Sequence, residues 1–156
     1  MTVIKMNDIT YRKLIWEDIN HFIALRQIQL QEEGVLPIFD LTPALLEYYQ
    51  KHFFDGTFVS WLAIKENDMI ATSGISFIEK PPYYSNPSGK IGLLSSMYTL
   101  PSYRRLGIAT RLLTFVVNEA KEYGCGAVHI TASDAGVYLY QSFGFQKSDT
   151  FLFYNL

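Results

Sequence analysis

The chain has 156 residues, of which 49% are hydrophobic and 18% charged, and its formal net charge is −2 at pH 7. This length suits one domain with a sizeable core, so we expect residues 1–156 to fold as a single domain. The composition excludes a disordered chain, and the slightly acidic balance argues against a nucleic-acid-binding protein.

The first third of the chain predicts an edge strand followed by two helices. The amino-terminal segment has no basic region before an apolar core, and no run of about 18 apolar residues occurs anywhere, so we expect neither a signal peptide nor a membrane span. Residues 9–14 alternate weakly, as in an edge strand, and residues 16–34 have helical spacing of apolar side chains. A second helix is predicted over 42–54, with Thr42 as the N-cap and Pro43 at the first helical position.

The periodicity then changes to two, which predicts a hairpin. Residues 58–65 and 69–78 read as long antiparallel strands with a turn between them. Residues 81–89 form a loop, because their prolines lack the backbone donor that a sheet requires. The adjacent Tyr83 and Tyr84 either line a pocket or shield the sheet edge, and we favour shielding.

The next strand is predicted over residues 90–100. Gly92 and the Ser95-Ser96 pair are candidate sites of a bulge or of a close backbone approach. An amphipathic helix begins near Leu106, because apolar residues recur there on one face.

This helix and the two strands around it predict a βαβ unit. The helix ends at Gly124 or Gly126, and strand 127–132 follows, so the two strands should be parallel and joined by a right-handed crossover. A short helix and an aromatic-rich last strand, 145–154, complete an α/β chain. We therefore expect a mixed, mostly antiparallel sheet with one parallel pair and helices on both faces. Cys125 is the only cysteine, so no disulfide can form within the chain, and a reducing cytoplasm fits.

Residues 98–113 predict a strand end, a basic turn and a helix start. Backbone N–H groups at a helix start have no intrahelical partner and, with the positive end of the helix dipole, bind phosphate oxygens. Gly107 permits close approach of a ligand, and Ala109 keeps the first turn slim. Arg104 and Arg105 add positive charge. The turn lacks the endings of a P-loop and of a dinucleotide fingerprint, so it predicts a different phosphate-bearing ligand.

Two motifs resemble the GCN5-related N-acetyltransferase (GNAT) family. Arg104, Gly107 and Ala109 match its Arg/Gln-x-x-Gly-x-Gly/Ala signature, and residues 139–145 resemble its Leu-Tyr-x-x-x-Gly-Phe closing motif. The order of the motifs and the strand between them agree over residues 57–154. The resemblance implies the acyl-coenzyme A (acyl-CoA) N-acyltransferase fold and an acetyl-CoA-dependent N-acetyltransferase.

The resemblance also implies where acetyl-CoA binds. In the family, the strands that correspond to 90–100 and 127–132 splay apart and hold the pantetheine arm, and the pyrophosphate caps the basic turn. The implied cofactor-binding residues are Met97, Tyr98, Thr99, Arg104, Arg105, Leu106, Gly107, Ile108, Ala109, Thr110 and Ser133. Ser133 and Gly136 stand where the family commonly has asparagine and alanine, which puts one contact to the arm in doubt. We expect Ser133 or Asp134 to cap the following helix.

The implied reaction is direct attack of a neutral amine on a thioester. It needs an amine without its proton, stabilisation of the carbonyl oxygen, and a proton for the leaving thiolate. A backbone N–H near Met97 would serve the oxygen, and Tyr140 takes the family's general-acid position, or else is a packed helical aromatic. No general base is identified, since His129 reads as structural. With three histidines and one cysteine, we expect no metal site.

The acceptor is a primary amine of a small molecule or a peptide. The acidic loop 32–40 resembles the lip over the acceptor site, so Glu32 and Glu33, and also Asp40, are candidates to bind an ammonium group, although solvated surface is the commoner role. The alternatives are a non-catalytic acyl-CoA-binding or sensing module and a structural interaction domain. We expect no membrane or nucleic-acid partner, and the aromatic last strand is compatible with a homodimer.

Overall fold

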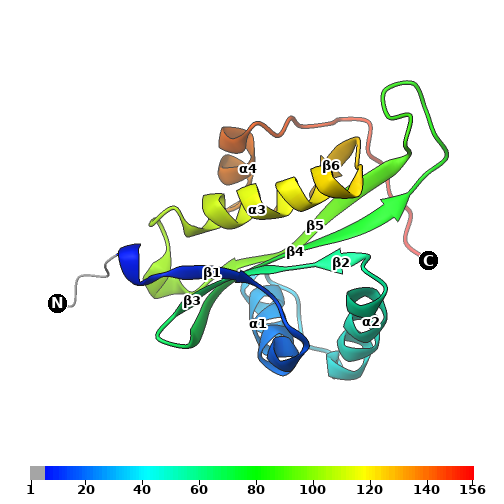
Figure 1. The fold of residues 1–156 in the computed structure, drawn as a ribbon. Helices are drawn as coiled ribbons and strands as arrows, with labels where there is room; N and C mark the ends of the chain where they lie inside the picture. Colours follow the sequence, from blue (N-terminus) through cyan, green and yellow to red (C-terminus); the bar gives the residue numbers. More distant parts are fainter. Residues whose placement is uncertain (1–5) are drawn as a thin grey trace.

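The computed structural model describes residues 6–156, which form a six-stranded sheet between two layers of helices (Figure 1). The strands are β1 (Thr10–Lys13), β2 (Phe58–Val59), β3 (Trp61–Lys65), β4 (Asp68–Glu79), β5 (Lys90–Thr99) and β6 (Ala127–His129). The helices are α1 (Ile19–Glu32), α2 (Thr42–Phe54), α3 (Ile108–Tyr123) and α4 (Val137–Phe143). Helices α1 and α2 cover one face of the sheet, and α3 and α4 cover the other.

The strand order confirms the predicted mixed sheet. It runs β1-β3-β4-β5-β6, with β2 also beside β4. Strands β5 and β6 are parallel and joined by α3, whereas the other pairs of described strands are antiparallel. Strand β1 lies at an edge, as its weak alternation predicted. Among residues 6–156, no helix is long and apolar enough to cross a membrane.

The hairpin of β3 and β4 is confirmed, but the strand predicted over 58–65 is interrupted at Ser60. Glu66 and Asn67 both have positive φ, 50° and 67°, as a tight two-residue hairpin turn requires. The Ser73 hydroxyl accepts from the Trp61 N–H (3.1 Å) and donates to the Trp61 carbonyl (2.7 Å). This side chain takes the place of a ladder partner, so β2 and β3 are separate strands.

The start of α2 differs from its prediction. Thr42 is the first helical residue rather than the N-cap, and Pro43 therefore follows at the second position. The Asp40 carboxylate accepts from the Thr42 N–H at 3.0 Å. An aspartate two residues upstream forms this local turn readily, so it supplies the cap that was assigned to Thr42.

Asn86, which is only 2% exposed, stabilises the loop between β4 and β5. Its Nδ2 donates to the Lys90 carbonyl at 3.0 Å, and its backbone pairs with that of Tyr83. Tyr84 is fully exposed, so the prediction that it shields the sheet edge is wrong.

A bulge and a short β6 open a fork in the sheet. The register of β4 and β5 shifts between Thr72 and Gly74, and Ser96 has a φ of 56°, which confirms the bulge predicted at the serine pair. Pairing of β5 with β6 stops at Leu93 and His129. Strand β6 therefore ends three residues before the predicted residue 132, because β5 and the chain after His129 no longer form a ladder.

The predicted last strand, 145–154, is wrong. The structure has no strand after α4, and the side chains of Phe151, Leu152, Phe153 and Tyr154 are 72–90% exposed. β-propensity describes how well a side chain fits a pleated, half-buried surface, and it cannot provide the neighbouring strand.

Two glycines act as predicted. Gly92 allows a close approach, since an added Cβ would lie 2.6 Å from Ile75 Cδ1. Gly124, with φ 92°, ends α3, and the N–H groups of Gly124 and Cys125 bond the carbonyls of Lys121 and Ala120. These paired bonds are the Schellman arrangement that glycine favours after a helix.

Candidate functional site

The basic turn, residues 104–110, has a backbone shape that gathers N–H groups. Arg104 has φ −73°, Arg105 has φ 62° and Gly107 has φ 80°, while Leu106 is not among the residues with positive φ. Arg104 itself is extended, with ψ 156°, and the alternation over Arg105, Leu106 and Gly107 is a turn conformation that directs successive N–H groups toward one side, which suits an anion.

All the N–H groups of this turn except that of Arg104 are unpaired. Arg104 N–H donates to the Pro101 carbonyl, and the next backbone donor with a partner is Arg111, which bonds the Gly107 carbonyl at 3.1 Å. Within the described chain, the six N–H groups from Arg105 to Thr110 make no hydrogen bond. They lie at the positive end of the 16-residue helix α3. A Cβ at Gly107 would meet no atom within 4 Å, so the approach to this row is open.

The Arg104 side chain contacts three residues that lie outside the basic turn. Its Nη2 donates to Glu32 Oε2 at 2.9 Å, its Nε donates to the Thr99 carbonyl at 2.9 Å, and its guanidinium lies over the Tyr98 ring. The Tyr98 hydroxyl donates to Glu32 Oε1 at 2.7 Å. This bond, together with that from Arg104, lowers the pKa of the Glu32 carboxyl. Glu32 therefore joins the end of α1 to the basic turn, and its charge is already matched.

The fork opens into a cavity of about 1330 Å³ that has walls from both faces of the sheet. Helices α1 and α2 and strand β4 line one side, while the start of α3, the chain after β6 and helix α4 line the other. Of the predicted site residues, Met97, Thr99, Ala109, Ser133, Tyr140 and Glu33 line this cavity. The other predicted site residues lie outside its lining: Tyr98 and Glu32, which bond each other, and the residues of the basic turn other than Ala109.

Gln29 joins α1 to the bulge of β5. It is 6% exposed, and its Nε2 donates to the Met97 carbonyl at 3.3 Å and to Glu33 Oε1 at 3.1 Å. Its Oε1 accepts from Arg26 at 3.2 Å. The sequence analysis missed Gln29, although a polar residue one turn beyond the buried Leu25 on an apolar helix face was a usable signal.

Tyr140 lies on α4 and is buried at the wall of the cavity. Burial raises its pKa to about 12, and the Glu33 charge acts in the same direction. The phenol therefore keeps its proton at neutral pH. The start of α4 is bonded by the Ser133 carbonyl, which accepts from the N–H groups of Gly136 and Val137, so the predicted side-chain cap is wrong.

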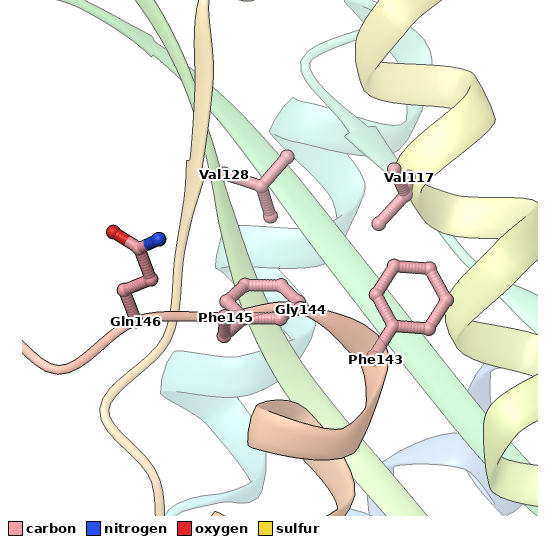
Figure 2. Close-up of a pocket in the computed structure, with 6 residues that line it drawn as sticks. All are labelled: Val117, Val128, Phe143, Gly144, Phe145 and Gln146. Atoms are coloured by element: carbon pink, nitrogen blue, oxygen red, sulfur yellow. The ribbon is translucent and has the colours of Figure 1, made fainter.

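His129 is exposed at the end of β6 and also lines the cavity. A smaller hollow of about 390 Å³ lies nearby, between α3, β6 and the end of α4. Figure 2 shows that Val117, Val128 and Phe143 gather around it. Its lining has no titratable side chain, so we place no chemistry there.

Comparisons with known proteins agree with this geometry. Residues 22–145 match the model of the acetyltransferase (GNAT) family. A predicted acetyltransferase from Clostridium acetobutylicum, solved with acetyl-CoA, is 38% identical, covers 94% of this chain and 96% of its own, and has a TM-score of 0.92. A GCN5-related N-acetyltransferase from Ralstonia eutropha is 23% identical, with coverages of 95% and 98% and a TM-score of 0.84.

A more distant structure has the same fold. An aminoglycoside N-acetyltransferase in complex with CoA is 20% identical over 95% of this chain and 94% of its own, with a TM-score of 0.76. No curated protein is significantly similar in sequence.

Proposed function

Because the chain belongs to the GNAT family of acetyltransferases, we propose that it transfers an acetyl group from acetyl-CoA to a primary amine of a small molecule or a peptide. The observation that carries this proposal is the row of six unpaired N–H groups from Arg105 to Thr110, at the edge of the forked sheet. Such a row binds a diphosphate without any special side chain.

The fork supports a place for the rest of the cofactor. With the pyrophosphate on the N–H groups of residues 106–110, the pantetheine arm would run along Met97 to Thr99, where β5 has no partner on its β6 side. Arg105, which has no acidic partner in the described chain, would add charge beside the phosphates. Ser133, on the opposite wall, would contact the arm.

The transfer step is balanced by groups in the same cavity. The neutral amine nitrogen forms a bond to the acetyl carbon, the carbon–sulfur bond breaks, the nitrogen releases one proton to solvent, and the thiolate takes one proton. Tyr140 would supply that proton, since its raised pKa keeps the phenol protonated. A backbone N–H near Met97 would stabilise the oxyanion. Glu33 would attract the ammonium group, because it lines the cavity while Glu32 is held by Arg104.

A substitution at Gly107 tests this proposal. In Gly107→Glu the carboxylate would face the diphosphate, and like charges placed together cost several kcal/mol, so CoA affinity should fall more than about a hundredfold. Isothermal titration with CoA measures the effect. Gly56→Glu is the matched control, because Gly56 has φ 79°, beside 80° at Gly107, and also open space around its Cβ. Unchanged affinity in Gly107→Glu would remove the phosphate assignment.

A thiol-release assay with a panel of amines tests the transfer itself. Turnover on at least one amine is expected. Tight CoA binding without turnover on any amine would favour the alternative of a non-catalytic acyl-CoA sensor. That alternative is suggested by Ser133, which stands where the family commonly has asparagine.

The carboxy-terminal segment supports a proposal about assembly. Its side chains from Phe151 to Tyr154 are exposed, and β6 leaves one edge of the sheet unpaired. Exposed apolar runs and free strand edges are covered most simply by another chain. A second copy of this protein would cover both at once.

A further inference from the structure

We propose that the amine acceptor also carries an anionic group, a carboxylate or a phosphate, and that Arg26 binds it. This inference rests on the proposed acetyl transfer and narrows its substrate class. The inference is based on one face of α1, where Arg26, Gln29 and Glu33 all line the cavity. Positions three and seven apart lie on the same helix face, so the three side chains point to one site.

The Arg26 guanidinium has N–H donors that are available to a ligand. It is partly buried, and its hydrogen bond is to Gln29 Oε1 at 3.2 Å. The four ion pairs among residues 6–156 all lie elsewhere, so no carboxylate in this part of the chain matches its charge. A guanidinium has five N–H donors in a planar fork that suits the two oxygens of a carboxylate or phosphate.

Orientation of Gln29 does not account for Arg26. Gln29 is already held by its own Nε2, which donates both to the Met97 carbonyl and to Glu33. The cation therefore adds little to the position of that amide. The charge of Arg26 also acts on Tyr49, which lines the cavity. It counteracts part of the rise that burial causes in the pKa of Tyr49.

The balance of charge selects against polycationic acceptors. Among the charged residues that line the cavity, Glu33 and Asp149 are acids, whereas Arg26, Lys80 and Lys147 are cations. A polyamine would need several carboxylates in this lining. One ammonium at Glu33 and one anion at Arg26 are consistent with this excess of cations.

The spacing of the two charges sets the distance between the two groups of the acceptor. Gln29 separates the two charged groups, because its Oε1 lies 3.2 Å from Arg26 Nη1 and its Nε2 lies 3.1 Å from Glu33 Oε1. This favours an amine and an anion separated by several bonds, as in an ω-amino acid, a dipeptide or an aminoalkyl phosphate.

The test uses matched pairs of acceptors in the thiol-release assay with acetyl-CoA. The pairs are 6-aminohexanoate and hexylamine, glycylglycine and its amide, and 3-aminopropyl phosphate and 3-aminopropanol. The wild type should prefer the anionic member of at least one pair by about tenfold or more. The first two pairs report a carboxylate and the third a phosphate, so the arms identify the anion.

Arg26→Gln should remove this preference. A hydrogen bond to a charged group predicts a fall in kcat/KM of about tenfold to a hundredfold for the anionic member, mainly through KM, with the neutral member changed less than about threefold. Arg26→Lys, which keeps the charge, should retain part of the preference. Arg111→Gln is the control, because Arg111 is exposed on α3, lies over Tyr11 and is not part of the cavity lining. CoA affinity and the thermal midpoint of each variant verify folding.

An equal preference for both members of every pair, or an equal loss on both in Arg26→Gln, would overturn the inference. If no amine is acetylated, titration of the same acceptors into the CoA-bound protein decides. If an anionic amine binds the wild type but not Arg26→Gln, the inferred class of acceptor is upheld even though the proposed transfer reaction fails. Absence of binding by every anionic amine would overturn both.

Discussion

Tyr140 and Glu33 show how single residues acquire a chemical role from their surroundings. Tyr138, two positions earlier on α4, is 82% exposed, whereas Tyr140 is 7% exposed and lines the cavity. Glu32 bonds Arg104, whereas the next residue, Glu33, lines the cavity, and burial together with the charge of Glu33 raises the pKa of Tyr140. Neighbours in the chain thus differ in burial, partner and charge, and the proposed roles follow those differences.

Tyr140→Phe should lower turnover by about a hundredfold, the lower end for loss of a general acid, and should leave CoA affinity near that of the wild type. Steady-state rates and isothermal titration measure the two quantities. Tyr138→Phe is the matched control on the same helix and should change neither. Full activity in Tyr140→Phe would leave this tyrosine with a packing role.

The same variant has a second readout in alkaline solution. The folded pKa of Tyr140 is about 12, above the ordinary value of 10.0, so the neutral phenol is favoured by folding. Its contribution to stability is complete below about pH 10 and is lost as the pH rises through about 12. Unfolding between these values should therefore be less sensitive to pH in Tyr140→Phe than in the wild type.

At the scale of elements, the fork depends on how β5 passes its neighbours. Gly92 lies where β5 crosses Ile75 of β4 and Ala120 of α3, and a Cβ there would be 2.6 Å from Ile75 Cδ1 and 3.4 Å from Ala120 Cβ. The close approach is just before the point at which β5 leaves β6. Tight packing on one side of β5 and a bulge further along therefore define where the cavity begins.

Gly92→Ala should lower the free energy of unfolding by about 1–3 kcal/mol, because the added methyl displaces Ile75 in a filled core. For a chain of this size, this corresponds to a fall of roughly 3–9 °C in the thermal midpoint. Calorimetry measures both.

Ile75→Val removes the Cδ1 atom that the new methyl meets, so it should rescue Gly92→Ala in part. The single change Ile75→Val is expected to cost about 0.5–1.5 kcal/mol through the lost methyl group. The double variant should be more stable than the sum of the single effects predicts, by roughly 1 kcal/mol. Strict additivity would show that Ile75 is not the obstacle.

At the scale of the whole molecule, the carboxy-terminal segment lies outside the three hydrophobic core clusters. One core lies between the sheet and helices α1 and α2, and the others lie beneath α3 and α4. Leu152, Phe153, Tyr154 and Leu156 are 78–117% exposed, so they add little to the stability of one chain. Their burial requires a surface that a single copy does not provide.

Removal of residues 152–156 should separate stability from association. For the full chain, the thermal midpoint should rise with protein concentration, because a second copy binds the folded state and not the unfolded one. For the shortened chain, the midpoint should not depend on concentration. Scans over a hundredfold range of concentration, with sedimentation velocity in parallel, measure both.

A control for this experiment lies in the loop between α1 and α2. Ile38 and Phe39 are 80% and 67% exposed, and their replacement by serine should leave the concentration dependence unchanged. Identical, concentration-independent midpoints for the full and shortened chains would contradict the proposed second copy.

The sequence by itself determined the features that depend on neighbours along the chain. The hairpin turn at Glu66 and Asn67, the helix end at Gly124 and the row of N–H groups before α3 were predictable, because backbone conformation within a few residues produces them. The periodicities likewise predicted the helices and most of the sheet, although residues 58–65 form two strands and β6 is shorter than predicted, and the two motifs indicated the family.

Only the tertiary structure decided which distant groups meet. Residues 145–154 have the composition of a strand but no adjacent strand, and β6 stops where β5 diverges. Arg104 meets Glu32 across 72 positions of the chain, and Gln29 meets Met97 across 68. Strand pairing, ion pairing and burial each require a partner in space, and no local pattern records how the folded chain brings that partner near.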